Sequence, residues 1–374
     1  MTRNKLHVPW RGQGPPRQFR SAVSLHSHTH HSQESLVFLY RLAARVGFID
    51  WAIKCGQRGS ASRLDLARGW WTPPLVPRAA WELERRQIES DLGLAALVSL
   101  TDHDSIEGPL SLKAADGLRE VTVSAEWTVP FHNTFLHLGI HNLPAAAAQQ
   151  AMAAMAHYTA HPRPEALSSL LRWFHEMPET LIVFNHPFWD EKGIGPKQHR
   201  RVLQAFLHRH GDTIHAFELN GLRPWAENLW VLELGRVWNK PVVSGGDRHG
   251  LEPNAVLNLS HAFTFGEFIE EVRVYGRSEI YLTEHYRRPL FWRMFDAVLD
   301  AVGDHEGHGL GWTRWDDRVF YLCEDGRARP LREIWQGRPP GPIRSFVAVA
   351  RTLHRSWVQR TLRAAAAGQQ ELVW

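Results

Sequence analysis

Short apolar runs of strand length recur along this 374-residue chain and alternate with longer stretches whose apolar positions have helical spacing. The short runs are rich in β-branched residues and end near Gly, Pro or Asp, which is typical of strands. Strands are predicted at 22–27, 95–101, 119–124, 135–140, 180–185, 214–219 and 241–245. Helices are predicted at 34–47, 79–92, 145–160, 165–177 and 198–209, followed by a last helix at 265–275 and a strand at 279–282. This alternation favours a parallel, barrel-like α/β core.

Two segments depart from the alternation. Residues 50–80 are rich in Gly, Trp and Pro and are expected to form a loop-like insertion, either a lid over the site or a surface decoration. Residues 286–374 contain a Pro-Pro-Gly-Pro breaker and end in an amphipathic helix that begins near Ile343. Its apolar stripe favours docking onto the core over membrane-surface binding. We therefore predict a tail at 1–21, a core domain at 22–285 with an insertion at about 50–90, and a C-terminal extension at 286–374.

The composition restricts the class of protein only loosely. The 43 basic and 39 acidic residues give a net charge of +4 and a pI near 9.2, a weak lean towards anionic partners that leaves nucleic-acid binding open. No transmembrane-length apolar stretch and no signal-peptide core are evident, so a soluble cytoplasmic protein is expected. Cys55 and Cys323 form no Cys-x-x-Cys pair, so neither a disulfide framework nor a thiolate metal site is indicated.

Residues that can bind metals follow several of the predicted strands. The first strand ends in Ser-Leu-His-Ser-His-Thr, where His26 and His28 are two residues apart and would point the same way in extended chain. The other motifs are Thr-Asp-His-Asp (101–104), Ser-Ala-Glu-Trp (124–127), Phe-Leu-His-Leu-Gly (135–139), Phe-Asn-His-Pro (184–187) and Gly-Asp-Arg-His-Gly (246–250). Because the ends of neighbouring strands share one rim, these side chains are expected to converge on a metal centre.

In this order the motifs resemble those of the PHP (polymerase and histidinol phosphatase) phosphoesterase domain over roughly residues 23–285. The resemblance implies a distorted (β/α)7 barrel of the PHP type, here with an insertion after the first β/α unit and a helical C-terminal extension. It implies a metal centre in which Glu126 bridges ions. The implied ligands are His26, His28, His103, Glu126, His137, His186, Asp247 and His249. Eight ligands exceed the roughly four that one zinc-like ion uses, so two or three divalent ions are expected, of zinc, manganese or iron.

One position departs from the family pattern. Where the family has Asp or His shortly after His-x-His-Thr, this chain has Gln33, whose neutral amide is a poor metal ligand. Glu34 or His31 could take its place, although a shift of one residue reverses the direction of a side chain in a strand. The sequence therefore leaves the occupancy of a third metal site open.

The implied activity is hydrolysis of a phosphate ester, in a small phosphorylated metabolite, a nucleotide or an oligonucleotide, with a metal-bound hydroxide as the nucleophile. Asp104 is expected to orient a metal-bound histidine or carry a proton, or alternatively to cap the next helix. Arg248 is a candidate phosphate clamp, and Asn220 and Arg223 are placed near the pocket by their position after a strand. Two alternatives remain: a metal-dependent hydrolase of a non-phosphate bond, and a catalytically inactive PHP-like binding domain.

Overall fold

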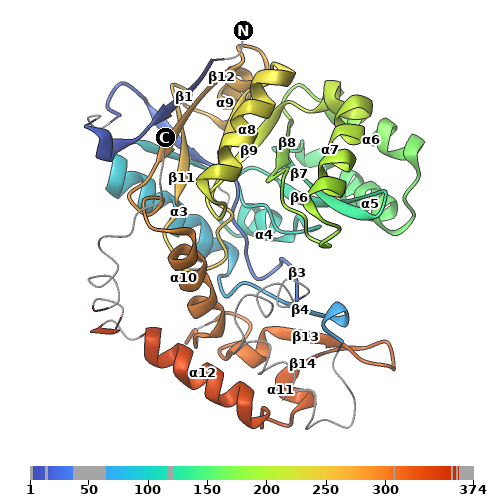
Figure 1. Cartoon of the computed structure of the whole chain (residues 1–374), viewed down its shortest axis with the longest axis vertical. Helices are drawn as coiled ribbons and strands as arrows, with labels where there is room; N and C mark the ends of the chain where they lie inside the picture. The colour runs from blue at the N-terminus through green and yellow to red at the C-terminus, as the bar shows by residue number, and fades with distance from the viewer. Residues whose placement is uncertain are drawn as a thin grey trace.

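The computed structural model describes residues 3–12, 16–36, 65–116, 121–306, 308–354, 357–358 and 361. These residues form a mixed α/β structure with two five-stranded sheets and one four-stranded sheet. In Figure 1 the two larger sheets and most of the helices occupy the upper part, and the C-terminal elements lie below them. No helix among the described residues is long and apolar enough to cross a bilayer.

The first five-stranded sheet has the order β1-β12-β11-β2-β5. Its strands are β1 (Arg3–His7), β12 (Arg277–Leu282), β11 (Val256–Ser260), β2 (Ser21–Ser24) and β5 (Ala95–Val98). β2 pairs in parallel with β5 and antiparallel with β11. The segment expected to be an N-terminal tail instead supplies β1, which pairs in parallel with β12. This strand therefore belongs to the core.

The second five-stranded sheet has the order β10-β9-β8-β7-β6. Its strands are β10 (Val242–Gly245), β9 (Ala216–Asn220), β8 (Leu181–Asn185), β7 (Thr134–His141) and β6 (Ala125–Phe131). β8, β9 and β10 run parallel, whereas β6, β7 and β8 pair antiparallel. The strand expected at 119–124 is not formed by its described residues, 121–124; β6 begins directly after them and carries Glu126 within it.

The described strands do not form the expected (β/α)7 barrel, because no sheet closes on itself. The two larger sheets meet at two isolated bridges, Ser27 with Arg248 and His103 with Glu126. The antiparallel pairs in both sheets replace the continuous parallel ladder of a regular β/α barrel. Both bridges involve or adjoin predicted metal ligands, so those ligands collect where the sheets meet.

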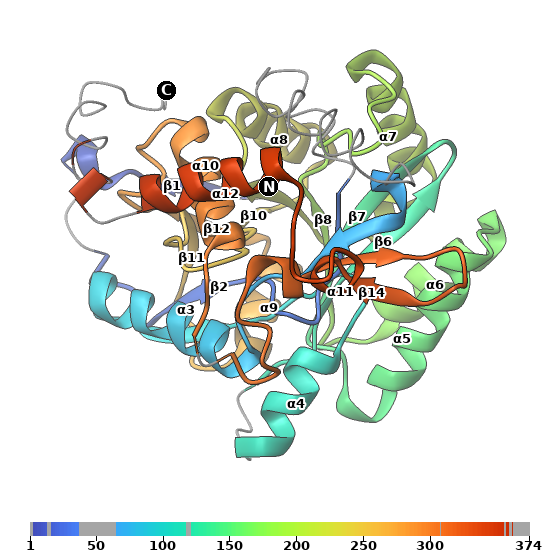
Figure 2. The same cartoon turned by 90° about the horizontal axis from the view of Figure 1, so that it is seen from below.

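Helices surround these sheets, as the view from below shows (Figure 2). The expected helices at 145–160, 165–177, 198–209 and 265–275 correspond to α5, α6, α7 and α9; α9 begins with a capping box of Thr264 and Glu267. The helix expected at 34–47 lies mostly outside the described residues, and its first two residues form β3 instead. The bounds are α3 (Pro77–Leu92), α4 (Glu107–Asp116), α5 (Ala145–Ala160), α6 (Pro164–Glu176), α7 (Pro196–His210), α8 (Trp225–Trp238) and α9 (Phe265–Arg273).

A small sheet joins β4, in the described part of the insertion, to the C-terminal extension. This sheet has the order β14-β13-β4-β3, and β13 pairs antiparallel with β4, far away in sequence. The apolar stripe of α12 packs with α10 and α11 through Val302, Ile334 and Val347, so it docks within the extension. In Figure 2, α11, α12 and β14 lie in front of the larger sheets. The bounds are β3 (Glu34–Ser35), β4 (Gly69–Trp71), β13 (Val319–Leu322), β14 (Ala328–Pro330), α10 (Leu290–Val302), α11 (Leu331–Ile334) and α12 (Gly341–His354).

Candidate metal centre

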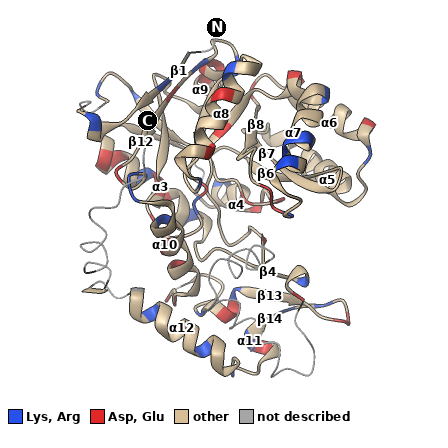
Figure 3. Cartoon of the chain, in the orientation of Figure 1, with Lys and Arg blue, Asp and Glu red and all other residues tan. Residues whose placement is uncertain are grey.

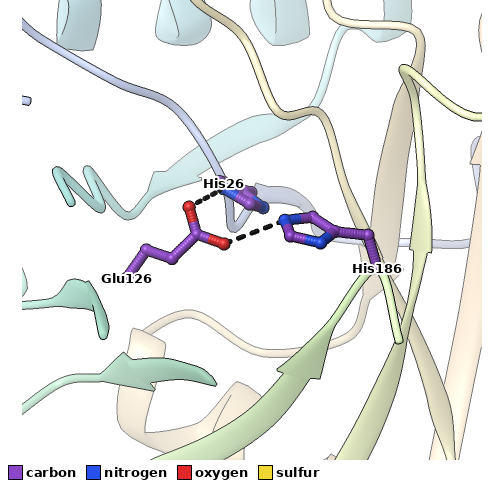
Figure 4. A group of neighbouring side chains, drawn as sticks. All are labelled: His26, Glu126 and His186. Carbon is purple, nitrogen blue, oxygen red and sulfur yellow. Dashed lines mark hydrogen bonds and ion pairs between the residues drawn. The ribbon is translucent and has the colours of Figure 1, made fainter. Parts of the chain in front are cut away.

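Glu126 lies at the centre of a group of buried imidazoles and carboxylates. Its side chain is fully buried on β6 and points between His26, after β2, and His186, after β8 (Figure 4). Glu126 Oε2 is 3.0 Å from His26 Nε2, and Oε1 is 3.0 Å from His186 Nε2. Asn185 donates its side-chain amide to Oε1 at 2.9 Å, which fixes the carboxylate. One carboxylate therefore faces two different imidazoles, as a bridging ligand must.

The His-x-His pair behaves as its spacing predicts. His26 and His28 are both 1% exposed, and their Nε2 atoms lie 2.9 Å apart. Asp102 holds this turn, because Thr29 donates both its backbone N–H and its hydroxyl to the buried Asp102 carboxylate. The two motifs that follow β2 and β5 are thus tied together next to the metal-binding groups.

His103 and His137 complete the surroundings of Glu126. His103 Nε2 lies 3.2 Å from Glu126 Oε2, and His137 Nδ1 lies 3.6 Å from Oε1. His137 is contributed by β7, the strand that pairs with β6. Both strands of the β6–β7 hairpin therefore contribute side chains to the same centre.

Asp247 and His249 approach from the turn after β10. Asp247 Oδ1 lies 3.6 Å from His26 Nε2 and 3.5 Å from His28 Nε2. Asp247 has a φ of 56°, a left-handed conformation that is uncommon outside glycine and that turns the chain at this point. The preceding Gly245 leaves space for another acid, because a Cβ there would overlap Glu218 Oε1.

Glu34, rather than Gln33, supplies a carboxylate at the position where the family pattern is broken. Glu34 Oε2 lies 3.4 Å from His103 Nε2 and 3.4 Å from His249 Nε2. Ser32 donates its hydroxyl to Glu34 Oε1 at 2.7 Å and orients the carboxylate. Gln33 lines the neighbouring cavity. The short strand β3 therefore places the acid one residue later than the family pattern does.

All eight ligands predicted from the sequence lie in this centre, together with Glu34. Four overlapping groups have ligand atoms within 4.8 Å of one another. They are His26–Glu126–His186, His26–His28–Asp247, His28–His103–Glu126 and His28–Glu34–His249. Mixed imidazole and carboxylate donors at such spacing fit zinc, manganese or iron, so the residues present fit the metal centre that the motifs imply.

Two acids behind the ligands were not predicted. His26 donates its Nδ1–H to Glu218 at 2.6 Å, and His137 Nε2 lies 3.0 Å from Glu191. Such acceptors fix the orientation of a metal-binding imidazole. Glu218 is 2% exposed between Phe217 and Leu219 on β9, and a lone acid in an apolar strand was the available sequence signal. Glu191 lies in a loop whose sequence gives no such signal.

Arg248 and Asp104, the two residues predicted to take part in catalysis, both lie beside the predicted ligands but make different contacts. The Arg248 guanidinium donates to the carbonyls of Gly250 and Leu251 and pairs with buried Glu84 at 3.3 Å. It holds the turn after β10, and this geometry does not support a phosphate clamp. Asp104 accepts the Thr128 N–H at 2.8 Å and so fastens the turn after β5 to β6; its proton-carrying role is untested. The helix-capping contact near this turn comes from the next residue, a serine.

Charge complementarity sets the protonation of the centre. Burial opposes charge on His26, but Glu126, Glu218 and Asp247 outweigh it and hold the pKa of His26 well above its usual value. Burial also opposes ionisation of Glu126, yet the surrounding imidazoles hold the pKa of Glu126 well below its usual range. Against burial, carboxylates including Glu34 raise the pKa of His249 to about 10. The buried imidazoles and carboxylates therefore favour each other's charged forms.

The guanidinium of Arg223 lines the same pocket as the predicted ligands. Its Nη2 lies 4.0 Å from Asp247 Oδ2, and its guanidinium stacks 4.0 Å from the centre of the Trp189 ring. Arg223 follows β9, and Asn220 is the last residue of β9; the Asn220 amide donates to both Glu218 and Asp247 at 3.2 Å. Arg223 therefore lines the pocket, as its position led us to expect, whereas Asn220 is buried beside Asp247 and does not line it.

Comparison with known proteins gives a distant structural likeness. No family model and no curated protein matches the sequence. A proposed metal-dependent phosphoesterase from Bifidobacterium adolescentis is 14% identical over 69% of this chain and 96% of its own, with a TM-score of 0.34. A two-domain protein from Bacteroides vulgatus, described as containing a proposed PHP-like metal-dependent phosphoesterase, is 13% identical over 75% of this chain and 69% of its own, with a TM-score of 0.38.

An amidohydrolase from Chromobacterium violaceum is also similar, with 14% identity over 48% of this chain and 84% of its own and a TM-score of 0.33. Structure comparison thus finds PHP-like metal-dependent phosphoesterases, the family that the motifs resemble. At these identities and TM-scores the alignments carry no argument about activity, which has to come from the side chains of the centre.

Proposed function

We propose that this protein is a metal-dependent hydrolase of phosphate esters. The observation that carries the proposal is the convergence of eight imidazole and carboxylate side chains in four groups that overlap at His28, His26 and Glu126, with His137 beside Glu126. A single ion uses about four ligands, so this set supports two or three ions. The proposal does not require the closed barrel that the family resemblance implies. The predicted ligands lie where the two larger sheets meet.

Bound divalent ions would supply the Lewis acidity that activates water and offsets charge on a phosphoryl group. The protein's own residues have separate tasks. Glu218 and Glu191 orient His26 and His137 through the ring nitrogens that face away from the centre. Arg223, held over Trp189 beside Asp247, takes the place proposed for Arg248 and is positioned to bind a phosphoryl oxygen. Asp104 positions the turn that carries His103.

The preferred substrate is a small molecule rather than a nucleic acid. Binding to a phosphate backbone requires a continuous basic surface. Figure 3 shows basic segments on α7 and on α12, which lie on well separated parts of the molecule. The centre itself opens into a pocket rather than onto a basic groove.

The test is a screen of phosphorylated metabolites and short oligonucleotides with manganese or zinc, run with wild-type protein and with Asp247→Asn. The substitution removes one carboxylate charge next to His26 and His28 with almost no change in volume. We expect bound metal to fall by about one ion and turnover to fall at least a hundredfold, in the range that loss of a charged group from a catalytic site produces. Metal content is measured by elemental analysis.

Asp91→Asn is the matched control, because Asp91 is exposed at the end of α3. It should keep both metal and activity. Equal turnover by the wild type and Asp247→Asn would overturn the proposal. Full metal content without turnover of any phosphate ester would favour a hydrolase of another bond or a binding domain.

A further inference from the structure

A cavity of about 600 Å³ extends from the metal centre into the C-terminal extension. At one end it is lined by metal-binding residues, among them His137, His186 and His249. Its volume is in the range of pockets that hold small ligands, whereas packed protein interiors leave few voids larger than a water molecule. The cavity is therefore large enough for a small ligand and continuous with the candidate metal centre.

The wall away from the metal centre is apolar. It is lined by Met294 and Val298 of α10, Trp335 directly after α11, and Ile343 and Phe346 of α12. Such a surface binds apolar groups, because each contact removes apolar area from water. A polar group would not complement this apolar wall.

The charged groups that line the cavity are unevenly distributed. Glu34, Glu191 and Arg223 lie at the metal end of the cavity. Each of them contacts one of the predicted metal ligands. Arg318 lines the other part, but its guanidinium donates to the backbone carbonyls of Trp312, Thr313, Ala301 and Gly303. The cavity therefore has a charged, metal-binding end and an apolar end, like an amphiphile.

We infer that the substrate is an amphiphilic phosphate monoester, with its phosphate at the metal centre and an alkyl or aryl tail against α10, α11 and α12. This inference rests on the proposed function and names its substrate class. The apolar wall comes from residues 294–347, beyond the part of the chain that resembles the PHP domain. The added segment thus selects the substrate, and the strand-end ligands carry out the chemistry.

Isothermal titration with n-alkylphosphonates from ethyl to octyl tests the inference, since their C–P bond resists hydrolysis. We expect affinity to rise about fourfold per added methylene until the cavity is filled, from about 0.8 kcal/mol per buried CH₂. The rise should persist in chelator-treated protein, because the tail site contains no metal ligand. An affinity that does not change with tail length would overturn the inference, and it is the result expected if part of the protein's own chain fills the cavity.

Ala297→Phe places a ring on the cavity-lining face of α10. It should reduce octylphosphonate affinity towards that of ethylphosphonate and leave the latter unchanged. Ala348→Phe, on the exposed face of α12, is the matched control and should have no effect. If both variants fold and bind octylphosphonate with equal affinity, the inference is overturned. If circular dichroism shows that Ala297→Phe is unfolded, the dependence of wild-type affinity on tail length decides the question.

The two proposals fail separately. Tail-length-dependent binding without hydrolysis of octyl phosphate leaves the amphiphile site standing and removes the phosphoesterase activity. Hydrolysis of small phosphate esters, with phosphonate affinity independent of tail length, removes the amphiphile site and leaves the activity.

Discussion

Glu34 shows how one residue changes the expected chemistry of the centre. It lies between His103 and His249 at 3.4 Å from each, next to a neutral Gln33 that offers no charge. Burial opposes its ionisation, but His103, His249 and His28 outweigh this and hold the pKa of Glu34 far below its usual range. A carboxylate with a lowered pKa at this position can complete a third ion site with His28 and His249.

Glu34→Gln should therefore remove about one metal ion per chain and leave the ions around Glu126 in place. An amide has the same shape but no charge, so the remaining imidazoles bind a divalent ion much more weakly. Elemental analysis after dialysis against a weak chelator measures the stoichiometry. Gln33→Ala is the matched control; if it loses metal to the same extent, Glu34 is not the third carboxylate.

At the scale of residues, the sequence indicated which side chains lie close together where a metal-binding residue type follows a strand. His26, His186 and Asp247 all follow strands, so their side chains were placed at one rim without knowledge of the fold. Glu218 was missed because its acid lies inside β9, where an apolar pattern hides one polar position. The direction of Arg248 could not be predicted, because it depends on carbonyls in its own turn and on Glu84 of α3.

At the level of elements, the pattern located most strands and helices but not their partners. Alternating runs identified β8, β9 and β10, which do pair in parallel. The antiparallel pairs of β11 with β12 and β2 were not predicted, because β11 is a short buried run that was not recognised as a strand, and its partner β2 lies far away in sequence. The pairing of β4 with β13 has the same cause.

α10 is coupled to the metal-binding turn through Asp300. Asp300 Oδ2 accepts the N–H groups of Leu251 and Glu252, and Glu252 in turn accepts the N–H of His249. Burial, with the nearby Glu252 carboxylate, raises the pKa of Asp300 to about 8. The C-terminal extension therefore contacts the centre through a carboxyl group whose pKa is raised.

Asp300→Asn should remove a pH-dependent loss of stability. A raised folded-state pKa means that the stabilisation is complete below the unfolded value of 3.8 and is lost as pH rises through about 8. The amide still donates and accepts above pH 8, so the variant should gain on the order of 1 kcal/mol relative to wild type between pH 6 and pH 9. Thermal unfolding across this range measures the gain.

Asp304→Asn serves as the control for that experiment, since Asp304 is an exposed acid that pairs with Arg351. It should shift the unfolding temperature by a small amount that does not follow the titration of Asp300. A difference between wild type and Asp300→Asn that is constant with pH would show that the Asp300 carboxyl does not titrate in this window.

For the whole molecule, the metal centre lies where the two larger sheets meet. His26 and His28 follow β2 of the first sheet, whereas Glu126, His186 and Asp247 belong to or follow strands of the second. Isolated bridges Ser27–Arg248 and His103–Glu126 join the two sheets at the centre, and Asn258 of β11 also hydrogen-bonds to Ser244 of β10. Ions that bind both sets of ligands would therefore connect the sheets as well as serve the reaction.

Metal removal should accordingly destabilise the whole core. A ligand that binds only the folded state at a hundred times its Kd adds about 2.7 kcal/mol of stability, and chelation withdraws that amount. Once the ions are removed, only bound protons offset the charges of the buried acids. The loss of stability should therefore show first as faster amide hydrogen exchange at 27–28, 103–104 and 247–249, where the bridges lie. Chelator already saturated with calcium is the control. Unchanged exchange at these segments, with metal shown to be absent, would mean that packing alone joins the two sheets and that the ions have no structural role.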